Sequence, residues 1–153
     1  MLHQTIKAVL VDLSGTLHID RQAIPGAQDA LKRLRRSGLA VKFVTNTTKE
    51  DLNSLHVRLE SMKFEISKDE IFTSLSAARN LIEKRGIRPY LMLSESALKD
   101  FEGIDTSEPN AVVVGLSPQH FEYEPMNKAL NLLLNKSQLI AINKARLVNI
   151  DNN

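Results

Sequence analysis

Residues 6–17 read Ile-Lys-Ala-Val-Leu-Val-Asp-Leu-Ser-Gly-Thr-Leu, and this stretch decides the fold. The apolar run from Ile6 to Leu13 is short and β-branched, which is typical of a strand buried on both faces of a sheet. It ends abruptly in the polar stretch Asp12 to Thr16. Pro25-Gly26 then indicate the start of a helix that we expect to end at Gly38.

The same alternation continues along the chain. Further helices are predicted after the second and third strands, around 97–101, and after Pro125, and the first of these would begin with a capping box of Thr47 and Glu50. Strands that alternate with amphipathic helices predict an α/β protein with right-handed βαβ units and a mainly parallel sheet. The later strands are expected at residues 39–44, 71–73, 90–93, 110–115 and 139–142.

Composition excludes several classes of protein. The 153 residues are 42% hydrophobic and carry a formal net charge of +2, which indicates a globular core and no broad basic face for nucleic acid. Without cysteine there is no disulfide, thiolate metal site or cysteine nucleophile. No apolar run approaches a membrane span, and residues 1–5 lack a signal-peptide pattern. We therefore expect a soluble, cytoplasmic protein.

Two strand ends carry groups suited to phosphate chemistry. Asp12, followed by Ser14-Gly15-Thr16, could act as a nucleophile or a Mg²⁺ ligand, and Gly15 would let backbone N–H groups approach an anion. Thr45, Asn46 and Thr47 offer neutral hydrogen-bond donors to phosphate oxygens at the next strand end. Parallel strands bring such loops to one edge of the sheet. The structural alternative is that Asp12 caps a turn and 45–47 cap a helix.

The residues also resemble a known family. The stretch 12–17 resembles the first motif of the haloacid dehalogenase superfamily, usually Asp-x-Asp-Gly-Thr-Leu. Residues 44–49, Val-Thr-Asn-Thr-Thr-Lys, resemble the second motif of its p-nitrophenylphosphatase-like (NagD-type) branch. The stretches 71–74 and 109–115 are similar to that branch as well, so the resemblance extends over roughly residues 6–146.

The resemblance implies a phosphatase mechanism. Asp12 would attack phosphorus, the Asp12 carboxylate and the Ser14 carbonyl would hold Mg²⁺, and Thr45 with Asn46 would hold the phosphoryl group. The fold implied is a Rossmann-like core, of which residues 1–85 would be the N-terminal part. Residues 86–146 would be part of an α/β cap domain that selects the leaving group and mediates homodimers. Residues 147–153 would be a divergent tail. The implied substrates are phosphorylated small molecules or phosphoamino acids.

Two departures from the family pattern lower the expected activity. Position 14 is Ser where most superfamily phosphatases have the Asp that protonates the leaving group. The chain also contains neither the Gly-Lys-Pro nor the Gly-Asp-Asp motif that the family needs. We expect a chain that stops inside the cap, with weak metal binding and little turnover, and with an open sheet edge and uncovered apolar surface.

Other interpretations remain open. One is a non-catalytic, truncated or regulatory form that associates with full-length subunits through the cap, and another is a receiver-like phosphoacceptor domain, which fits the single Asp12 poorly. His18 could touch substrate, although we expect it at a loop surface. The basic residues Lys32, Arg33, Arg35 and Arg36 indicate a solvated helix end rather than a nucleic-acid patch.

Overall fold

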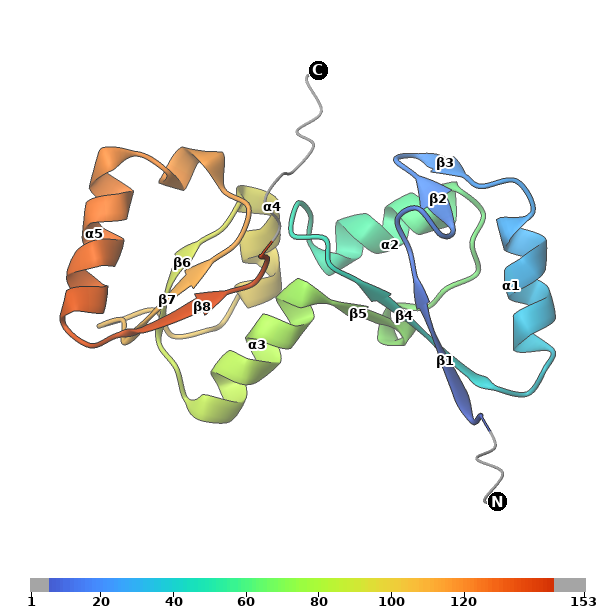
Figure 1. Cartoon of the computed structure of the whole chain (residues 1–153), viewed down its shortest axis with the longest axis horizontal. Helices are drawn as coiled ribbons and strands as arrows, with labels where there is room; N and C mark the ends of the chain where they lie inside the picture. Colours follow the sequence, from blue (N-terminus) through green and yellow to red (C-terminus); the bar gives the residue numbers. More distant parts are fainter. Residues whose placement is uncertain (1–5, 145–153) are drawn as a thin grey trace. The chain divides into compact units, whose positions relative to one another are not determined.

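The computed structural model describes residues 6–144, which form two compact units, one up to Ser76 and one from Ala77 (Figure 1). Strands and helices alternate in both units, as the sequence predicts. The division between the units falls inside helix α3 (Ser74–Arg85). The predicted boundary between residues 85 and 86 lies at the other end of that helix, where Gly86 has a φ of 60° and ends it.

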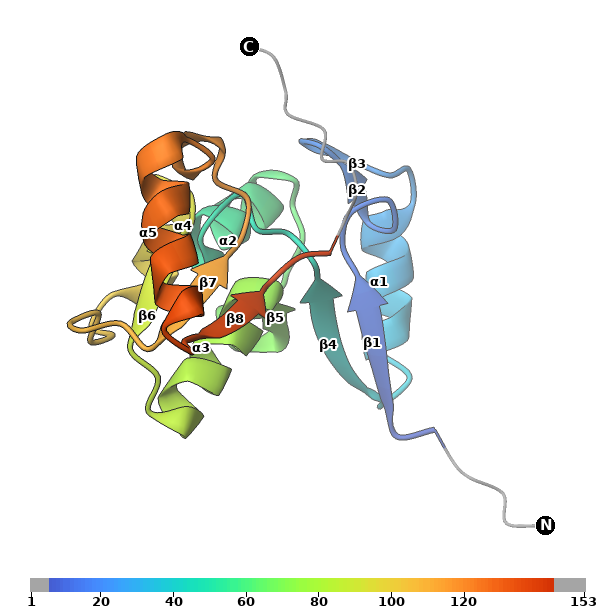
Figure 2. The same cartoon turned by 60° about the vertical axis from the view of Figure 1, so that its left-hand side comes forward.

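A three-stranded parallel sheet forms the framework of the first unit. Its strands are β1 (Ala8–Asp12), β4 (Ala40–Thr45) and β5 (Ile71–Thr73), in that spatial order. Figure 2 shows β1 and β4 side by side and pointing the same way. All three carboxyl ends therefore lie at one edge, as expected for parallel strands joined by crossover helices.

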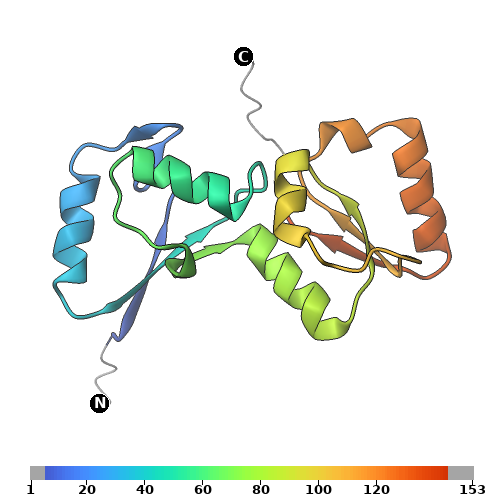
Figure 3. The same cartoon turned by 180° about the vertical axis from the view of Figure 1, so that it is seen from behind.

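The core of this unit lies on one face of the sheet. Helices α1 (Ala27–Arg35) and α2 (Leu52–Ser61) lie along that face (Figure 3). Phe43 of β4 is fully buried in the core that they cover. The inward positions of β4 alternate with exposed ones, which is the period-two pattern of a half-covered strand. One face of the sheet thus carries most of the hydrophobic stabilisation of the unit.

The opposite face of this sheet is exposed within the part of the chain that the structure describes. Leu10 of β1 is 67% exposed and Phe72 of β5 is 47% exposed. The prediction that the first strand is buried on both faces is therefore wrong, because β1 lies at a sheet edge and no element covers its outer face in residues 6–144. The uncovered apolar surface that we expected is present.

Helix α2 begins differently from the prediction. Its N-cap is Asp51, whose buried carboxylate accepts a hydrogen bond from the backbone N–H of Ser54 at 3.1 Å. The capping box predicted from Thr47 and Glu50 is wrong, because the helix starts at Leu52 and Glu50 instead forms an ion pair with Arg58. An aspartate N-cap satisfies one of the free N–H groups of the first turn.

The second unit repeats the parallel arrangement with a more deeply buried sheet. Its strands are β6 (Pro89–Met92), β7 (Ala111–Val114) and β8 (Gln138–Ala141), with β7 in the middle. The consecutive residues Val112 and Val113 of β7 point to opposite faces and are both almost fully buried, so both faces of that strand are covered. A continuous apolar run of this kind is typical of a strand that is covered on both faces.

Helices of unequal length connect these strands. Helix α4 (Glu95–Leu98) continues into a 3₁₀ turn (Lys99–Phe101) between β6 and β7. Helix α5 (Tyr123–Leu134) packs Ala129, Leu132 and Leu133 against the sheet. None of the helices in residues 6–144 is both long and apolar enough to span a membrane.

Candidate active site

The carboxyl edge of the β1-β4-β5 sheet brings the two predicted polar loops together. Asp12 is the last residue of β1 and pairs in register with Val44, the residue before Thr45. Thr45 in turn pairs with Thr73, the last residue of β5. Because neighbouring strands lie about 4.8 Å apart, the loops that follow β1 and β4 start as neighbours. The predicted loops 12–16 and 45–47 thus share one edge.

The loop after β1 is a tight turn that leaves Asp12 exposed. The carbonyl of Leu13 accepts hydrogen bonds from the N–H groups of Thr16 and Leu17, at 3.2 and 2.9 Å. Thr16 Oγ1 lies 3.5 Å from Asp12 Oδ2, a long contact that leaves the carboxylate largely available. Ser14 is exposed beside it. Asp12 is therefore accessible to an incoming group, as a nucleophile or metal ligand must be.

Gly15 is required in this turn by its backbone conformation. Its φ is +80°, in the left-handed region where residues other than glycine are strained. A Cβ at this position would touch nothing, so the constraint is the dihedral angle and not space. The Gly15 N–H donates to the carbonyl of His18 at 2.8 Å. The sequence analysis expected Gly15 to let backbone N–H groups approach an anion, and its own N–H is engaged by the protein in this conformation.

The loop after β4 is held by its own hydroxyl groups. Buried Thr45 accepts a hydrogen bond from the Thr47 N–H at 3.3 Å, and Ser74 Oγ donates to the Thr47 carbonyl at 3.0 Å. Asn46 is exposed at the tip. Thr73 Oγ1 accepts from the Ser76 N–H at 2.9 Å, so a hydroxyl at the same edge caps helix α3. The sequence analysis included 71–74 in the family resemblance but missed the hydrogen-bonding roles of these two hydroxyl groups, although a Thr-Ser pair directly before a helical pattern is a cap signal.

His18 lies where the sequence did not place it. The prediction of a loop surface position is wrong, because His18 is only 1% exposed. It belongs to β2 (His18–Ile19), which pairs with β3 (Gln22–Ala23) in a hairpin that follows the Asp12 loop. Burial, followed by the charge of Arg58, lowers the pKa of His18, which keeps its ring neutral near pH 7. No spacing pattern in the sequence distinguishes this histidine from a surface one.

An ion pair connects this hairpin to the second loop, and sequence reasoning missed it. Arg58 of α2 forms a salt bridge with Glu50, and both side chains are about four-fifths buried. Arg58 Nη1 also donates to the carbonyl of Asp20 at 2.8 Å. Glu50 and Arg58 are eight residues apart, so helical periodicity alone gives no signal for the pair.

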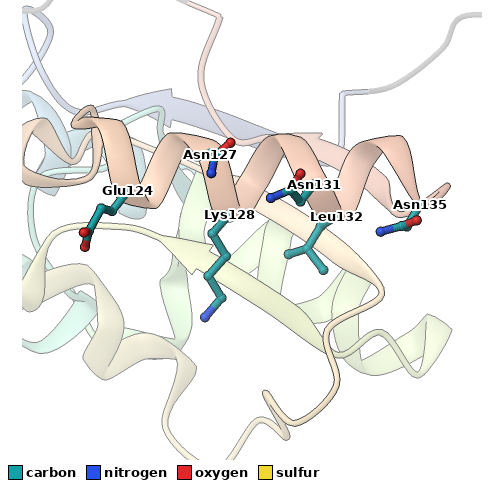
Figure 4. A pocket seen from close by; sticks show the side chains of 6 residues that line it. All are labelled: Glu124, Asn127, Lys128, Asn131, Leu132 and Asn135. Atoms are coloured by element: carbon teal, nitrogen blue, oxygen red, sulfur yellow. The ribbon is translucent and has the colours of Figure 1, made fainter.

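Two hollows lie away from this edge. One, of about 780 Å³, lies at the amino edge of the β1-β4-β5 sheet, where Arg35 pairs with Glu70 at 2.6 Å. The other, of about 330 Å³, runs along α5 and is lined by Asn127, Asn131, Asn135 and Lys128 among others (Figure 4). The ammonium group of Lys128 lies over the ring of Tyr90. Both hollows are open and hold none of the predicted site residues, so the carboxyl edge remains the candidate site.

The fold and the loops together define a parallel α/β protein with a Rossmann-like sheet and a free carboxylate at the end of its first strand. The model of the family described as "Haloacid dehalogenase-like hydrolase" matches residues 9–107. The chain therefore belongs to the haloacid dehalogenase-like hydrolase family, as the motifs of the sequence indicated.

Individual relatives agree with this assignment. The chain is 60% identical to bovine haloacid dehalogenase-like hydrolase domain-containing protein 2, over 94% of this chain and 55% of that protein. It is 36% identical to human phospholysine phosphohistidine inorganic pyrophosphate phosphatase, over 92% of this chain and 54% of that one. The chain thus spans about half the length of the curated relatives it matches.

The solved structures show the same partial correspondence. The structure resembles p-nitrophenyl phosphatase from Archaeoglobus fulgidus with a TM-score of 0.82 and 26% identity. That likeness covers 92% of this chain and 56% of the archaeal chain. The branch suggested by the second sequence motif is therefore confirmed at the level of structure.

Proposed function

We propose that this chain carries the nucleophile-bearing part of a Mg²⁺-dependent phosphoric monoester hydrolase. The observation that carries the proposal is the register of Asp12 with Val44, which starts the Asp12 loop beside the loop of Thr45 to Thr47. Asp12 is exposed and weakly engaged, as a nucleophile requires. The phosphatase relatives support the same reaction class.

The chemistry would proceed through an aspartyl-phosphate on Asp12. A carboxylate oxygen forms the bond to phosphorus while the bond from phosphorus to the leaving oxygen breaks, and the leaving group departs with that electron pair. Water then hydrolyses the acyl phosphate and regenerates Asp12. The side chains of Thr45, Asn46 and Thr47 would bind the phosphoryl oxygens during both transfers, beside the turn that Gly15 shapes.

The residues at this edge suit magnesium chemically but hold few ligands for it. The Asp12 carboxylate and the Ser14 carbonyl are hard oxygen donors of the kind that Mg²⁺ prefers. The ion would offset the repulsion between carboxylate and phosphate. Residues 6–144 contain no cluster of three or more acidic, histidine or cysteine side chains arranged to hold a metal. We therefore expect weak metal binding.

We infer weak or absent turnover for the chain as given. Its sequence has neither a Gly-Lys-Pro nor a Gly-Asp-Asp motif to balance the charge of Asp12 and phosphate. Ser14 stands where a general acid is usual, and a hydroxyl is a poor proton donor to a leaving group. A positioned general acid typically raises the rate by about 10²–10⁴-fold, and that contribution is lost here. A leaving group that needs little protonation is favoured for the same reason.

The substrates we propose are phosphorylated small molecules or phosphoamino acids in the cytoplasm. The near-neutral charge balance disfavours nucleic acid. The relative named for phospholysine and phosphohistidine hydrolysis supports the phosphoamino acid class. Residues 86–146 would belong to a cap that selects among these leaving groups.

A second candidate is a non-catalytic form that associates with full-length subunits, or with itself, through the cap. Helix α5 favours it, because one stripe of that helix exposes apolar side chains: Tyr123, Met126, Leu130 and Leu134. Such exposed apolar surfaces mark association sites.

Leu130→Glu should abolish association measured by sedimentation while leaving the circular dichroism spectrum unchanged. Association that persists in Leu130→Glu would contradict the cap interface.

Titration with Mg²⁺ and inorganic phosphate tests the phosphatase proposal. We expect the amide NMR signals of Gly15 and 45–47 to shift in the millimolar range, and Asp12→Asn to abolish the shifts. Asp105→Asn, at an exposed aspartate of the second unit, is the matched control. Phosphate shifts that survive in Asp12→Asn, or never occur, would reject the site. A large Mg²⁺-dependent phosphatase rate that depends on Asp12 would reject only the inference of weak turnover.

A further inference from the structure

We propose that Arg58 is a positioning residue that fixes the loop after β1 by tying it to the loop after β4. The inference rests on the proposed function, because it assigns to Arg58 the alignment of the phosphate-binding loops. Arg58 lies on α2 and touches neither Asp12 nor Thr45 in any contact described above; it would act through Glu50, Asp20 and His18. We call these four residues the Arg58 bracket.

Within the bracket, the ion pair of Arg58 with Glu50 reaches the loop after β4. Arg58 Nε lies 3.2 and 3.3 Å from the two carboxylate oxygens of Glu50, and Nη2 lies 2.5 Å from the first of them. Glu50 directly precedes Asp51, the N-cap of α2. Because both charged side chains are mostly buried, this pair is less screened than a surface ion pair. This ion pair therefore fixes where the loop from Thr45 enters α2.

The other contacts of Arg58 in the bracket reach the hairpin after the Asp12 loop. Arg58 Nη1 donates to the Asp20 carbonyl at 2.8 Å and lies 3.4 Å from His18 Nδ1. Asp20 has a φ of 49°, so its left-handed backbone is the tight point of the hairpin. A charged donor to this carbonyl holds the turn in place.

The hairpin passes this constraint to Gly15. The carbonyl of His18 accepts a hydrogen bond from the Gly15 N–H at 2.8 Å, and Ser14 and His18 form an isolated backbone β-bridge. Gly15 lies three residues from Asp12, within the turn that would contact phosphate. Movement of the hairpin would therefore break the hydrogen bond that sets the Gly15 conformation. The bracket thus connects Glu50, in one loop, to Gly15, in the other.

The imidazole of His18 completes the bracket as a neutral acceptor. A guanidinium group can only donate hydrogen bonds, so a hydrogen bond in this 3.4 Å contact has Nδ1 of the neutral His18 ring as its acceptor. Nε2 is buried and has no hydrogen-bond partner within residues 6–144. A protonated ring would place a second positive charge against Arg58, which the lowered pKa of His18 avoids.

The second unit contains a matched arginine for the control. Arg79 donates to Glu83 at 2.8 Å and to the carbonyls of Asp100 and Glu102 at 2.6 and 3.1 Å. It therefore uses one carboxylate and backbone carbonyls, as Arg58 does, but contacts no residue of the candidate site. Lysine at either position keeps the charge and loses the planar fork that reaches several acceptors at once.

Arg58→Lys and Arg79→Lys, compared by hydrogen exchange and phosphate titration, test the proposal. We expect Arg58→Lys to speed exchange of the Gly15 amide about tenfold and to weaken binding of Mg²⁺ with inorganic phosphate roughly fivefold or more. Arg79→Lys should change neither by more than about twofold, even where both variants lower the melting temperature equally. A merely structural Arg58 would lower the melting temperature without this selective effect.

Glu50→Gln provides a second route to the same result. It should reproduce the loss of Gly15 protection, and the double variant with Arg58→Lys should be no worse than either single one, because all three break the same bracket. Unchanged Gly15 exchange in Arg58→Lys would overturn the positioning role, whether or not phosphate binds. Failure of the wild-type chain to bind phosphate would instead reject the proposed function, and the Gly15 result would still decide on the bracket.

Discussion

The middle strands of the two sheets, β4 and β7, occupy the same place in the same three-stranded parallel topology but are covered differently. β7 is buried on both faces, whereas β4 alternates between buried and exposed residues because helices pack on only one side of its sheet. The comparison shows that the stabilising contacts and the candidate reactive group lie on different parts of the β1-β4-β5 sheet. Its covered face carries the packing, and its carboxyl edge carries the free carboxylate of Asp12.

The largest effect should come from the covered face of β4. Phe43→Ala removes a fully buried ring and should lower the free energy of unfolding by about 3–5 kcal/mol. Phe72→Ala, on the exposed face of the neighbouring strand, should cost less than about 1 kcal/mol. Urea denaturation followed by circular dichroism measures both changes. Equal costs for the two variants would show that the outer face is covered in solution.

A buried hydroxyl should reveal the difference between the two sheets. Val113→Thr places a hydroxyl in the fully buried β7 and should cost about 2 kcal/mol, because the oxygen has no water to bind. Leu10→Thr, on the open face of β1, should cost under about 0.5 kcal/mol. Thermal unfolding of both variants provides the measurement. A neutral Val113→Thr would mean that the face of β7 that carries Val113 is not covered.

An ion pair of the first unit should contribute more to stability than an ion pair of the second unit. Arg35 donates two hydrogen bonds to Glu70 and holds the pKa of that carboxyl at about 2. Glu70→Gln should cost about 1.5 kcal/mol at pH 7. Glu108→Gln, at the exposed end of a 3.9 Å contact with Arg88, should change stability by less than about 0.5 kcal/mol.

The Glu70 contribution should also depend on pH. Because the folded pKa is below the unfolded value of 4.5, the stabilisation is fully present above about pH 4.5 and is lost as the pH falls toward about 2. The difference in unfolding free energy between wild type and Glu70→Gln should therefore shrink over that interval. A difference that stays constant from pH 7 to pH 2.5 would contradict the role of Arg35.

Helix caps should give the smallest effects. Asp51→Ala removes a buried carboxylate that accepts from Ser54 and should cost about 1 kcal/mol. Ser94→Ala, at the N-cap of the four-residue α4, should cost about 0.5 kcal/mol. The two variants can be compared in one set of denaturation curves, and a larger loss for Ser94→Ala would reverse the expected order.

Much of the fold follows from local sequence patterns. The apolar runs predicted the five main strands after β1. The runs did not reveal coverage: β1 and β7 look alike in sequence, yet Leu10 is exposed and Val113 is buried. An apolar run states what a strand can bury, whereas coverage depends on elements far away in the chain.

The sequence predicted the position of the candidate site but not the side chains that hold its loops in place. Asp12 and Thr45 lie at the strand ends where the sequence placed them, since parallel strands align their carboxyl ends. The burial of His18 was predicted wrongly and Arg58 was missed, because their contact arises where the hairpin meets α2 and leaves no periodic signal. The capping box failed for a related reason: Glu50 is engaged by a tertiary partner that local rules do not contain.

The order of pairing in the two sheets has a consequence for how the chain is made. In each of the two three-stranded parallel sheets, every strand after the first pairs with the one synthesised before it in that sheet: β4 with β1, β5 with β4, β7 with β6 and β8 with β7. A chain that emerges from the ribosome amino end first therefore presents each new strand to a partner already outside. Both sheets can grow in the order of translation, and the edge that carries Asp12 exists as soon as Thr73 has emerged.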